Sequence, residues 1–208
     1  MAEGEQSLYT LQKRDVSKAG EVLADAFQHD PAWMKLFEGA SGFDHKYRAF
    51  FQTPVRYCMT FGTARATSAD LEGIVAWVSG DLADMTFSRL IRSGAMKYGM
   101  RIGMKCAKKM KLVLKPLPED RKKHMEGKPY TYLMMIGVAS RYQGKGFGKK
   151  LLQMVIDESE KRGDFLYLET ETEKNVQLYQ RFGFKTVKRI SLPIIELPLW
   201  EMVREPGT

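Results

Sequence analysis

A glycine-rich turn carries the clearest chemical signal in the sequence. It consists of Gly144, Gly146 and Gly148, with two lysines beside them, Lys145 and Lys149. Glycine allows positive φ angles and lets the backbone approach a ligand closely. Because the turn follows a buried strand and opens an amphipathic helix, free N–H groups of the first helical turn favour an anion in front of it. The turn therefore predicts a site for a pyrophosphate group.

Other phosphate-binding motifs match this turn less well. A P-loop has Lys-Ser or Lys-Thr after its second glycine, whereas Lys149 is followed by Lys150. The dinucleotide fingerprint is G-x-G-x-x-G, and Glu169 at the end of the next strand would suit its ribose-binding acid. The chain beyond the turn is too short for a doubly wound sheet, but a nucleotide-binding oxidoreductase stays an alternative. A turn without a ligand is disfavoured, because alternating glycines are costly unless the backbone must approach something.

Asn175 and Tyr179 form a second motif, downstream of a strand that ends in Glu169. They are four residues apart and therefore share one face of a helix. A tyrosine hydroxyl held close to a leaving group can supply a proton to it, although a buried tyrosine is also a common core residue. Gly183 follows the helix as its C-terminal cap, with Phe184 after it.

Together these motifs resemble the GNAT superfamily of N-acetyltransferases. Residues 143–148, Gln-Gly-Lys-Gly-Phe-Gly, resemble its Q/R-x-x-G-x-G/A signature, and the acid, Asn, Tyr and Gly-Phe that follow have the family's spacing. The resemblance implies that the turn binds the pyrophosphate of acetyl-CoA, that the preceding strand pairs with the pantetheine arm, and that Tyr179 lies by the thioester sulfur. The cofactor-binding residues that it implies are Ile136, Gly137, Val138, Gln143, Gly144, Lys145, Gly146, Phe147, Gly148, Lys149 and Asn175.

The same resemblance implies an α/β (α+β) fold of the GNAT type. This is a central mixed, twisted sheet of about six to seven strands, flanked by helices, with a helical insertion before the cofactor-binding strand. The resemblance covers roughly residues 57–204, and we expect residues 1–208 to form one acyl-CoA N-acyltransferase domain. Tyr130–Thr131 departs from the pattern of the most similar branch, so the acceptor is not carried over. The segments that resemble that branch, the puromycin-acetyltransferase-like one, are residues 27–33, 132–138 and 198–206.

Amide formation from a thioester requires a proton acceptor, because an alkylamine with a pKa of about 10.4 is mostly ammonium at neutral pH. A carboxylate can accept that proton directly or through water. Glu169 at the strand end is the candidate, and Glu171 and Glu173 are interpreted as a solvated acidic turn. By resemblance, a backbone amide near Ile136 stabilises the oxyanion and Tyr179 protonates the leaving thiolate.

The predicted function is therefore an N-acetyltransferase that transfers acetyl from acetyl-CoA to a primary amine of a small molecule, by direct attack in a ternary complex. Its predicted catalytic residues are Tyr179 and Glu169. No metal is expected, because the histidines and cysteines lack the spacing of metal ligands. The alternatives are a nucleotide-binding oxidoreductase and a non-catalytic acyl-CoA sensor, and the intact Tyr179 and Asn175 argue against the sensor.

Hydrophobic periodicity and turn residues place these motifs on alternating elements. The second half of the chain is expected to run strand, helix, strand, helix, strand, strand. The expected helices span residues 13–38, interrupted at 29–31, and 44–57, 147–161 and 174–181; the expected strands span 59–66, 73–78, 130–138, 165–170, 184–190 and 199–204.

The net charge of +8 comes from one segment. Between Asp84 and Glu119 there are nine cations and no acid. The rest of the chain has 24 of the 33 basic residues and all 25 acidic residues, so its net charge is −1. Residues 84–120 are expected to form a basic helical insertion in which three methionines repeat every four residues, broken near Gly99 or Gly103. Three interpretations are open: a solvated face, a lid over the acceptor site with adaptable methionines, or a surface for acidic lipid or nucleic acid.

Composition and the chain's N-terminus exclude several classes of protein. Hydrophobic residues make up 44% of the chain, which supplies a core and argues against disorder. No segment approaches the roughly 20 apolar residues of a membrane span. The N-terminus lacks a signal-peptide pattern, and Cys58 and Cys106 are expected to be free thiols, so we expect a cytoplasmic protein. Its expected partner is a small-molecule amine and not a nucleic acid, and its expected state is a monomer or homodimer.

Overall fold

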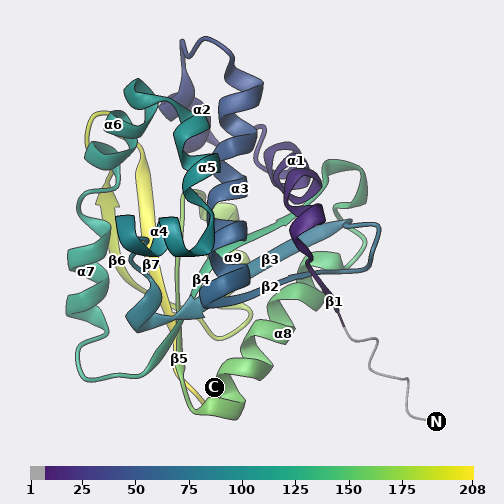
Figure 1. Cartoon of the computed structure of the whole chain (residues 1–208). Helices are drawn as coiled ribbons and strands as arrows, with labels where there is room; N and C mark the ends of the chain where they lie inside the picture. The colour runs from purple at the N-terminus through teal and green to yellow at the C-terminus, as the bar shows by residue number, and fades with distance from the viewer. Residues whose placement is uncertain (1–7) are drawn as a thin grey trace.

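A mixed seven-stranded sheet forms the centre of the molecule (Figure 1). The structure is a computed structural model that describes residues 8–208, so part of the N-terminal stretch in which we expect no export signal lies outside the described residues. The strand order is β1-β2-β3-β4-β5-β7-β6, and neighbours are antiparallel except β4 and β5, which are parallel. The predicted fold class is confirmed. The strand bounds are β1 Tyr9–Thr10, β2 Gly62–Ala66, β3 Gly73–Ser79, β4 Tyr130–Val138, β5 Phe165–Thr170, β6 Lys185–Ser191 and β7 Pro198–Arg204.

Nine α-helices surround this sheet in the part of the chain that the structure describes. Their bounds are α1 Val16–Ala26, α2 Pro31–Phe37, α3 Phe43–Phe61, α4 Phe87–Ser93, α5 Met96–Gly99, α6 Met104–Val113, α7 Leu117–His124, α8 Phe147–Arg162 and α9 Glu173–Gln180. The predicted interruption at 29–31 is confirmed. Asp30 caps α2 and Pro31 is its first residue, a position where the missing N–H and fixed φ of proline do no harm.

The parallel strands β4 and β5 diverge along their length. They form a ladder only where Tyr130–Tyr132 faces Phe165–Tyr167. β4 continues to Val138 and β5 to Thr170 without pairing to each other. A register shift between β3 and β4 adds an irregularity on the other edge of β4, and such bulges bend a strand. The second half of β4 therefore has backbone groups on one edge that no strand satisfies.

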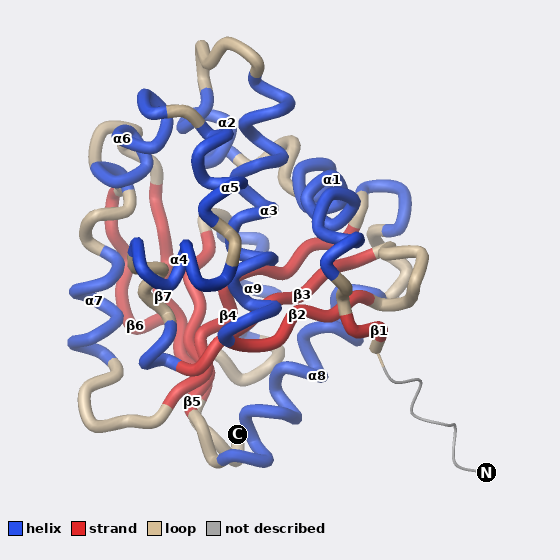
Figure 2. Tube along the Cα trace, in the orientation of Figure 1, coloured by secondary structure: helices blue, strands red, loops and turns tan. Residues whose placement is uncertain are grey.

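The two faces of the sheet bury different helices. Along β3, Ile74, Ala76 and Val78 belong to the core shared with α1, α2 and α3, whereas Val75 and Trp77 belong to the core shared with α8. This alternation follows from the two-residue repeat of a strand, and burial on both faces explains why β3 is apolar at nearly every position. Figure 2 shows α8 on the opposite side of β2 and β3 from α1 and α3.

Helix α3 is longer than predicted. It runs through Pro54 as far as Phe61, so the first strand of the hairpin begins at Gly62 and not near Met59. A proline inside a helix removes one backbone hydrogen bond. The middle of α3 is buried in the core, and tertiary packing of this kind stabilises a helix more than local preference does.

The basic segment folds into four short helices, of which α7 was not predicted. Two prolines near its start do not prevent a helix. The N–H groups of the first helical turn have no intrahelical acceptor, so the N–H group that a proline lacks is not missed there. Acids in its first turn and four basic residues in its last turn complement the helix dipole. Gly103, at φ +82°, breaks the methionine repeat as predicted. No helix in residues 8–208 is long and apolar enough to cross a membrane.

The two cysteines are buried in the core and free, as predicted. Cys58 lies in α3 and Cys106 in α6. Burial raises the pKa of the Cys58 thiol, because an apolar surrounding disfavours the charged thiolate. Cys58 is therefore a packing residue and not a reactive nucleophile.

Candidate active site

The glycine turn adopts backbone conformations that require glycine. Gly144 has φ +76° and Gly146 has φ +86°, both in the left-handed region. No atom lies within 4 Å of where a Cβ would stand at either position. The glycines are therefore needed for the course of the backbone and not because neighbouring atoms crowd them.

The N-terminus of α8 is open toward the same space. Gly146 is its N-cap residue and offers no side chain to cap the helix, so N–H groups of the first turn are left for another partner. Lys145 and Lys149 are exposed beside the turn. Backbone donors, the helix dipole and two cations together fit a pyrophosphate group.

Polar contacts hold the turn against β4 and α1. The Gln143 side-chain amide donates to the Val138 carbonyl at 3.1 Å. The Ser140 backbone N–H donates to the Asp25 carboxylate at 2.6 Å, and the Gln28 amide donates to the Ser140 hydroxyl at 2.8 Å. The Gln143 side chain, a predicted cofactor contact, thus also stabilises the turn through its hydrogen bond to β4.

The three predicted contact residues of β4 differ in their surroundings. Ile136 and Val138 pack against the hydrophobic cluster that also contains Tyr179. Gly137 faces α1, and a Cβ there would stand 2.9 Å from Cδ2 of Leu23 and 3.1 Å from Cβ of Ala26. The glycine at 137 is therefore required by the close approach of α1, and only its backbone is available to a ligand.

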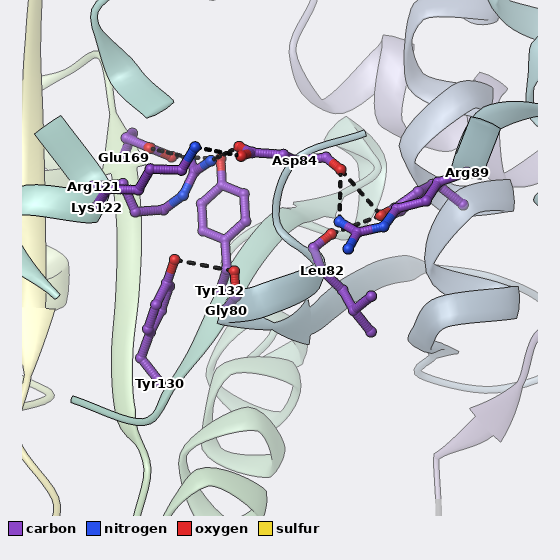
Figure 3. A network of polar contacts seen from close by, with 10 residues as sticks. Gly80, Leu82, Asp84, Arg89, Arg121, Lys122, Tyr130, Tyr132 and Glu169 are labelled. Atoms are coloured by element: carbon purple, nitrogen blue, oxygen red, sulfur yellow. Dashed lines mark hydrogen bonds and ion pairs between the residues drawn. The ribbon is translucent and has the colours of Figure 1, made fainter. Parts of the chain in front are cut away.

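Glu169 is buried in a polar network that links β5 to the basic segment (Figure 3). The Tyr132 hydroxyl donates to its Oε2 at 2.6 Å, and the Arg121 guanidinium lies 3.4 Å from its Oε1. The same guanidinium, only 5% exposed, lies 2.6 Å from the Asp84 carboxylate and stacks over the Tyr132 ring at 4.6 Å. Burial raises the pKa of Glu169, while Arg121 and Tyr132 oppose that rise by stabilising its carboxylate.

Glu171 is buried as well, which corrects its interpretation as part of a solvated turn. The residue is 8% exposed, whereas Glu173 is exposed as predicted. Within residues 8–208 its carboxylate has no salt bridge and no side-chain hydrogen bond, in contrast to Glu169. Burial raises the pKa of Glu171 well above its usual range, and the nearby Asp30 carboxylate raises it further. The turn after β5 therefore carries a carboxylate that lacks a cation.

Asp30 and Glu171 form what we call the acidic pair. Asp30 is buried, and its Oδ1 accepts hydrogen bonds from the backbone N–H groups of Ala32 at 3.0 Å and Trp33 at 3.1 Å. Burial raises the pKa of Asp30, and the two N–H donors oppose that rise. Burial raises the pKa of the Tyr47 hydroxyl, and both members of the pair raise it further. The loop before α2 thus brings a second carboxylate to the end of β5.

Tyr179 lies on α9 beside this acidic pair. Its ring is buried and packs against Phe184, with the centroids 5.5 Å apart. Burial raises the pKa of its hydroxyl, and the Glu171 carboxylate raises it further. Asn175 is half-buried one turn earlier on the same helix, and its backbone N–H is capped by the Thr172 hydroxyl at 3.3 Å. The structure therefore brings Tyr179 near Glu171, in a position that stays protonated at neutral pH.

Comparison with known proteins agrees with this geometry. Residues 105–184 match the family model described as Acetyltransferase (GNAT) family. An uncharacterized N-acetyltransferase of Schizosaccharomyces pombe is 27% identical over 207 residues, which are 95% of this chain and 83% of that protein. These similarities support an acyltransferase enzyme of the GNAT type.

Solved structures share the fold of this acetyltransferase over nearly its whole length. A structure described as histone acetyltransferase HPA2 and related acetyltransferase, from Corynebacterium glutamicum, has a TM-score of 0.65 at 21% identity and covers 97% of both chains. A polyamine N-acetyltransferase of Drosophila melanogaster has a TM-score of 0.62 at 14% identity and covers 96% of this chain and 99% of its own. The sheet has one parallel strand pair, which excludes the doubly wound fold of a dinucleotide-binding oxidoreductase.

Several residues of the candidate site have no signal in the local sequence. Asp30 precedes Pro31, and an acid before a proline is a signal for the N-terminus of a helix. That signal indicates the helix, but it does not indicate that Asp30 lies near Glu171. Arg121 lies in the helix that was not predicted, and Asp84 lies 37 residues before it. No local spacing could have joined residues that meet only when the insertion folds back onto the sheet.

Proposed function

We propose that this acetyltransferase transfers the acetyl group of acetyl-CoA to a primary amine of a small molecule, by direct attack in a ternary complex. The observation that carries the proposal is a buried carboxylate without a cationic partner, Glu171, beside Tyr179 at the end of β5. An alkylammonium substrate would supply the positive charge that the surroundings of Glu171 lack. It must also lose a proton before it can attack, and a carboxylate can accept that proton.

Acetyl-CoA fits two features of the chain. The N–H groups of residues 144–148 and the lysines beside them would hold the pyrophosphate. The unpaired edge of Ile136–Val138 would pair with the pantetheine arm, with Asn175 as a further contact. When bound, the cofactor supplies an activated acetyl carbonyl. A backbone N–H near Ile136 is the proposed donor to the oxyanion that develops there.

The proposal moves the proton-accepting role from Glu169 to Glu171. Both oxygens of Glu169 already face donors, Tyr132 and Arg121. Glu171 has no such partner, and the pKa of its carboxyl is raised well above its usual range by burial and by Asp30, which makes its carboxylate a stronger base. A general base is most effective when its pKa lies near the working pH. Glu169 is then a positioning residue that ties the basic segment to β5 through Arg121.

Tyr179 is the proposed hydrogen-bond donor to the leaving sulfur. A thiol has a pKa of about 8.5, so the thiolate that leaves accepts a proton readily at neutral pH. The pKa of Tyr179 is raised by burial and by Glu171, so its hydroxyl keeps its proton until the sulfur develops negative charge. Stabilisation of the thiolate by a held hydroxyl is therefore its principal contribution.

A small cationic amine is the acceptor class that the charges favour. The acidic pair, Asp30 and Glu171, would attract an ammonium in a surrounding that screens charge poorly. A protein of the same fold over the full length of the chain is described as a polyamine N-acetyltransferase, which is consistent with an acceptor of this kind. Membership of the puromycin-acetyltransferase-like branch stays a prediction.

A thiol-release assay with acetyl-CoA and a panel of amines tests the proposed reaction. The panel should contain a diamine or polyamine, an aminonucleoside, a neutral amino-acid amide and a peptide with a free N-terminus. We expect thiol release with the small cationic amines and little with the peptide. Release only with the peptide would contradict the small-molecule acceptor, and no release with any amine would contradict the proposal as a whole.

Replacing Glu171 by Gln tests the proton acceptor. We expect kcat to fall by about 100-fold with unchanged affinity for acetyl-CoA, because a general base contributes at least that much. The acidic limb of the pH–rate profile should disappear too, since a raised pKa at Glu171 makes the wild type lose activity as the pH falls and this carboxylate is protonated. The matched control is Glu173→Gln, two residues on and exposed, and an equal loss in both variants would refute the assignment.

Replacing Tyr179 by Phe tests the donor to sulfur. We expect kcat to fall by about tenfold with little change in the dissociation constant of acetyl-CoA, because the ring still packs against Phe184 while one hydrogen bond is lost. Steady-state kinetics and calorimetry measure the two quantities separately. Unchanged turnover would remove Tyr179 from the reaction.

A further inference from the structure

The basic insertion carries large apolar side chains on its outer side. Six of the ten exposed large hydrophobic residues that the structure describes lie between Met85 and Leu112. Phe87 is 72% exposed, Met100 68% and Met104 75%. Helices α4 and α5 pack against α3, and α6 packs against α2, so these side chains point away from the core that holds the helices in place. Folding normally removes large apolar side chains from water, and a concentration of exposed ones marks an interaction surface.

The same segment is the only strongly cationic part of the chain. None of its nine cations forms a salt bridge with a carboxylate in residues 8–208, and the next acids on either side are Asp84 and Glu119. The rest of the chain is close to neutral. The nine cations are Arg89, Arg92, Lys97, Arg101, Lys105, Lys108, Lys109, Lys111 and Lys115.

Cations and exposed apolar side chains alternate along the outer side. Met100 is followed by Arg101, Met104 by Lys105, and Leu112 follows Lys111. All six are exposed. An anionic bilayer offers partners for both kinds of side chain at once, because its headgroups pair with the cations while its acyl boundary receives the apolar groups.

We propose that the outer side of α4–α6 is a docking surface for a lipid bilayer with anionic headgroups. Charge complementarity selects an anionic surface, and the exposed methionines, Ile91 and Leu112 select a bilayer over a nucleic acid. A nucleic acid would pair with the cations and stack its bases on aromatic rings, and Phe87 is the only aromatic side chain among the exposed hydrophobic residues of this segment. The helices are short and lie on the surface, so the contact is peripheral.

Co-sedimentation of the full chain with vesicles tests this surface. The vesicles contain phosphatidylcholine alone, or phosphatidylcholine with phosphatidylserine. We expect binding to the second kind only, weakened by salt because the cations are exposed. Removing two cations with Lys105→Gln/Lys108→Gln should lower the affinity by about tenfold or more, since each basic residue near an anionic surface contributes about fivefold.

Two further variants separate this surface from its alternatives. Met100→Ser/Met104→Ser keeps every charge and should also lose most vesicle binding, whereas Lys18→Gln/Lys161→Gln removes two exposed cations elsewhere and should bind as the wild type does. Turnover of a small amine should be unchanged in all of them. Three outcomes overturn the proposal: no preference for anionic vesicles, binding of single-stranded RNA in place of vesicles with no effect of the methionine change, or a raised KM for the amine in the methionine variant, which would make the segment a lid.

Discussion

The glycine turn and the basic insertion both present positive potential, but they do so by different physical means. At the turn, the positive end of α8 and its free N–H groups are fixed by two glycines with positive φ. In the insertion, the charge sits on long side chains of short helices. Backbone donors have one geometry and select a ligand of one shape, while flexible cations on a broad surface select only the sign of the charge. Net charge by itself therefore says little about the ligand of either region.

The largest expected effect is at the turn, where Gly146→Trp should abolish measurable binding of acetyl-CoA. The indole would stand at the N-terminus of α8, where no neighbouring atom lies within 4 Å of the Cβ position. Gly127→Trp is the matched control, because Gly127 also has a positive φ and open space around it but lies before β4. Both variants should lose about 1 to 3 kcal/mol of stability from backbone strain, and calorimetry should show lost affinity in the first alone. Equal affinities would disprove the position of the pyrophosphate site.

The next effect concerns the contact between the basic segment and β5, where Arg121→Met should lower the free energy of unfolding by about 3 kcal/mol. The change leaves the buried Glu169 carboxylate without its cation. Lys122→Met is the control, since Lys122 also pairs with Asp84 but is 69% exposed, and exposed pairs contribute at most about 1 kcal/mol. Denaturant titration measures both. If adding Glu169→Gln does not restore part of the loss in Arg121→Met, the stranded charge is not its cause.

A second polar contact, between α7 and β7, makes the stability of the fold depend on pH. Glu201 is buried, accepts a hydrogen bond from the Tyr167 hydroxyl at 2.7 Å and lies 3.5 Å from His124. Burial raises the pKa of Glu201 to about 7, above the value of about 4.3 in an unfolded chain. Between these values the folded state holds a proton that the unfolded state has released, so stability falls as the pH rises, by up to about 4 kcal/mol in total.

The variant Glu201→Gln should remove that fall and be more stable than the wild type above about pH 7. Below about pH 4 the two proteins should be equally stable, because Glu201 is then protonated in both states. Thermal unfolding over the pH range gives the slope, with the exposed Glu205→Gln as control. A slope that Glu201→Gln leaves intact would assign it to other groups whose pKa is raised on folding.

Local patterns predicted the elements near the turn almost residue by residue. The bounds of β4 and β5 match the predicted runs 130–138 and 165–170. Runs of apolar, β-branched and aromatic residues between turn residues are typical of strands. Prediction failed where tertiary contacts override local preference. Pro54 does not end α3, because the helix is buried around it, and α7 was missed because its prolines resemble a stop signal and not a start.

The sequence by itself determined the family resemblance, the glycine turn for which we propose a pyrophosphate ligand, and the placing of Asn175 and Tyr179 on one helix, because each depends on residues a few positions apart. Only the tertiary structure decided which carboxylate is free. Glu169 meets Arg121, 48 residues away, and Glu171 instead meets Asp30, which reaches it from the loop before α2. Two acids with the same local sequence pattern differ in charge environment because the chain brings a cation to one of them and a second acid to the other. Such long-range neighbours set pKa values, and no local spacing records them.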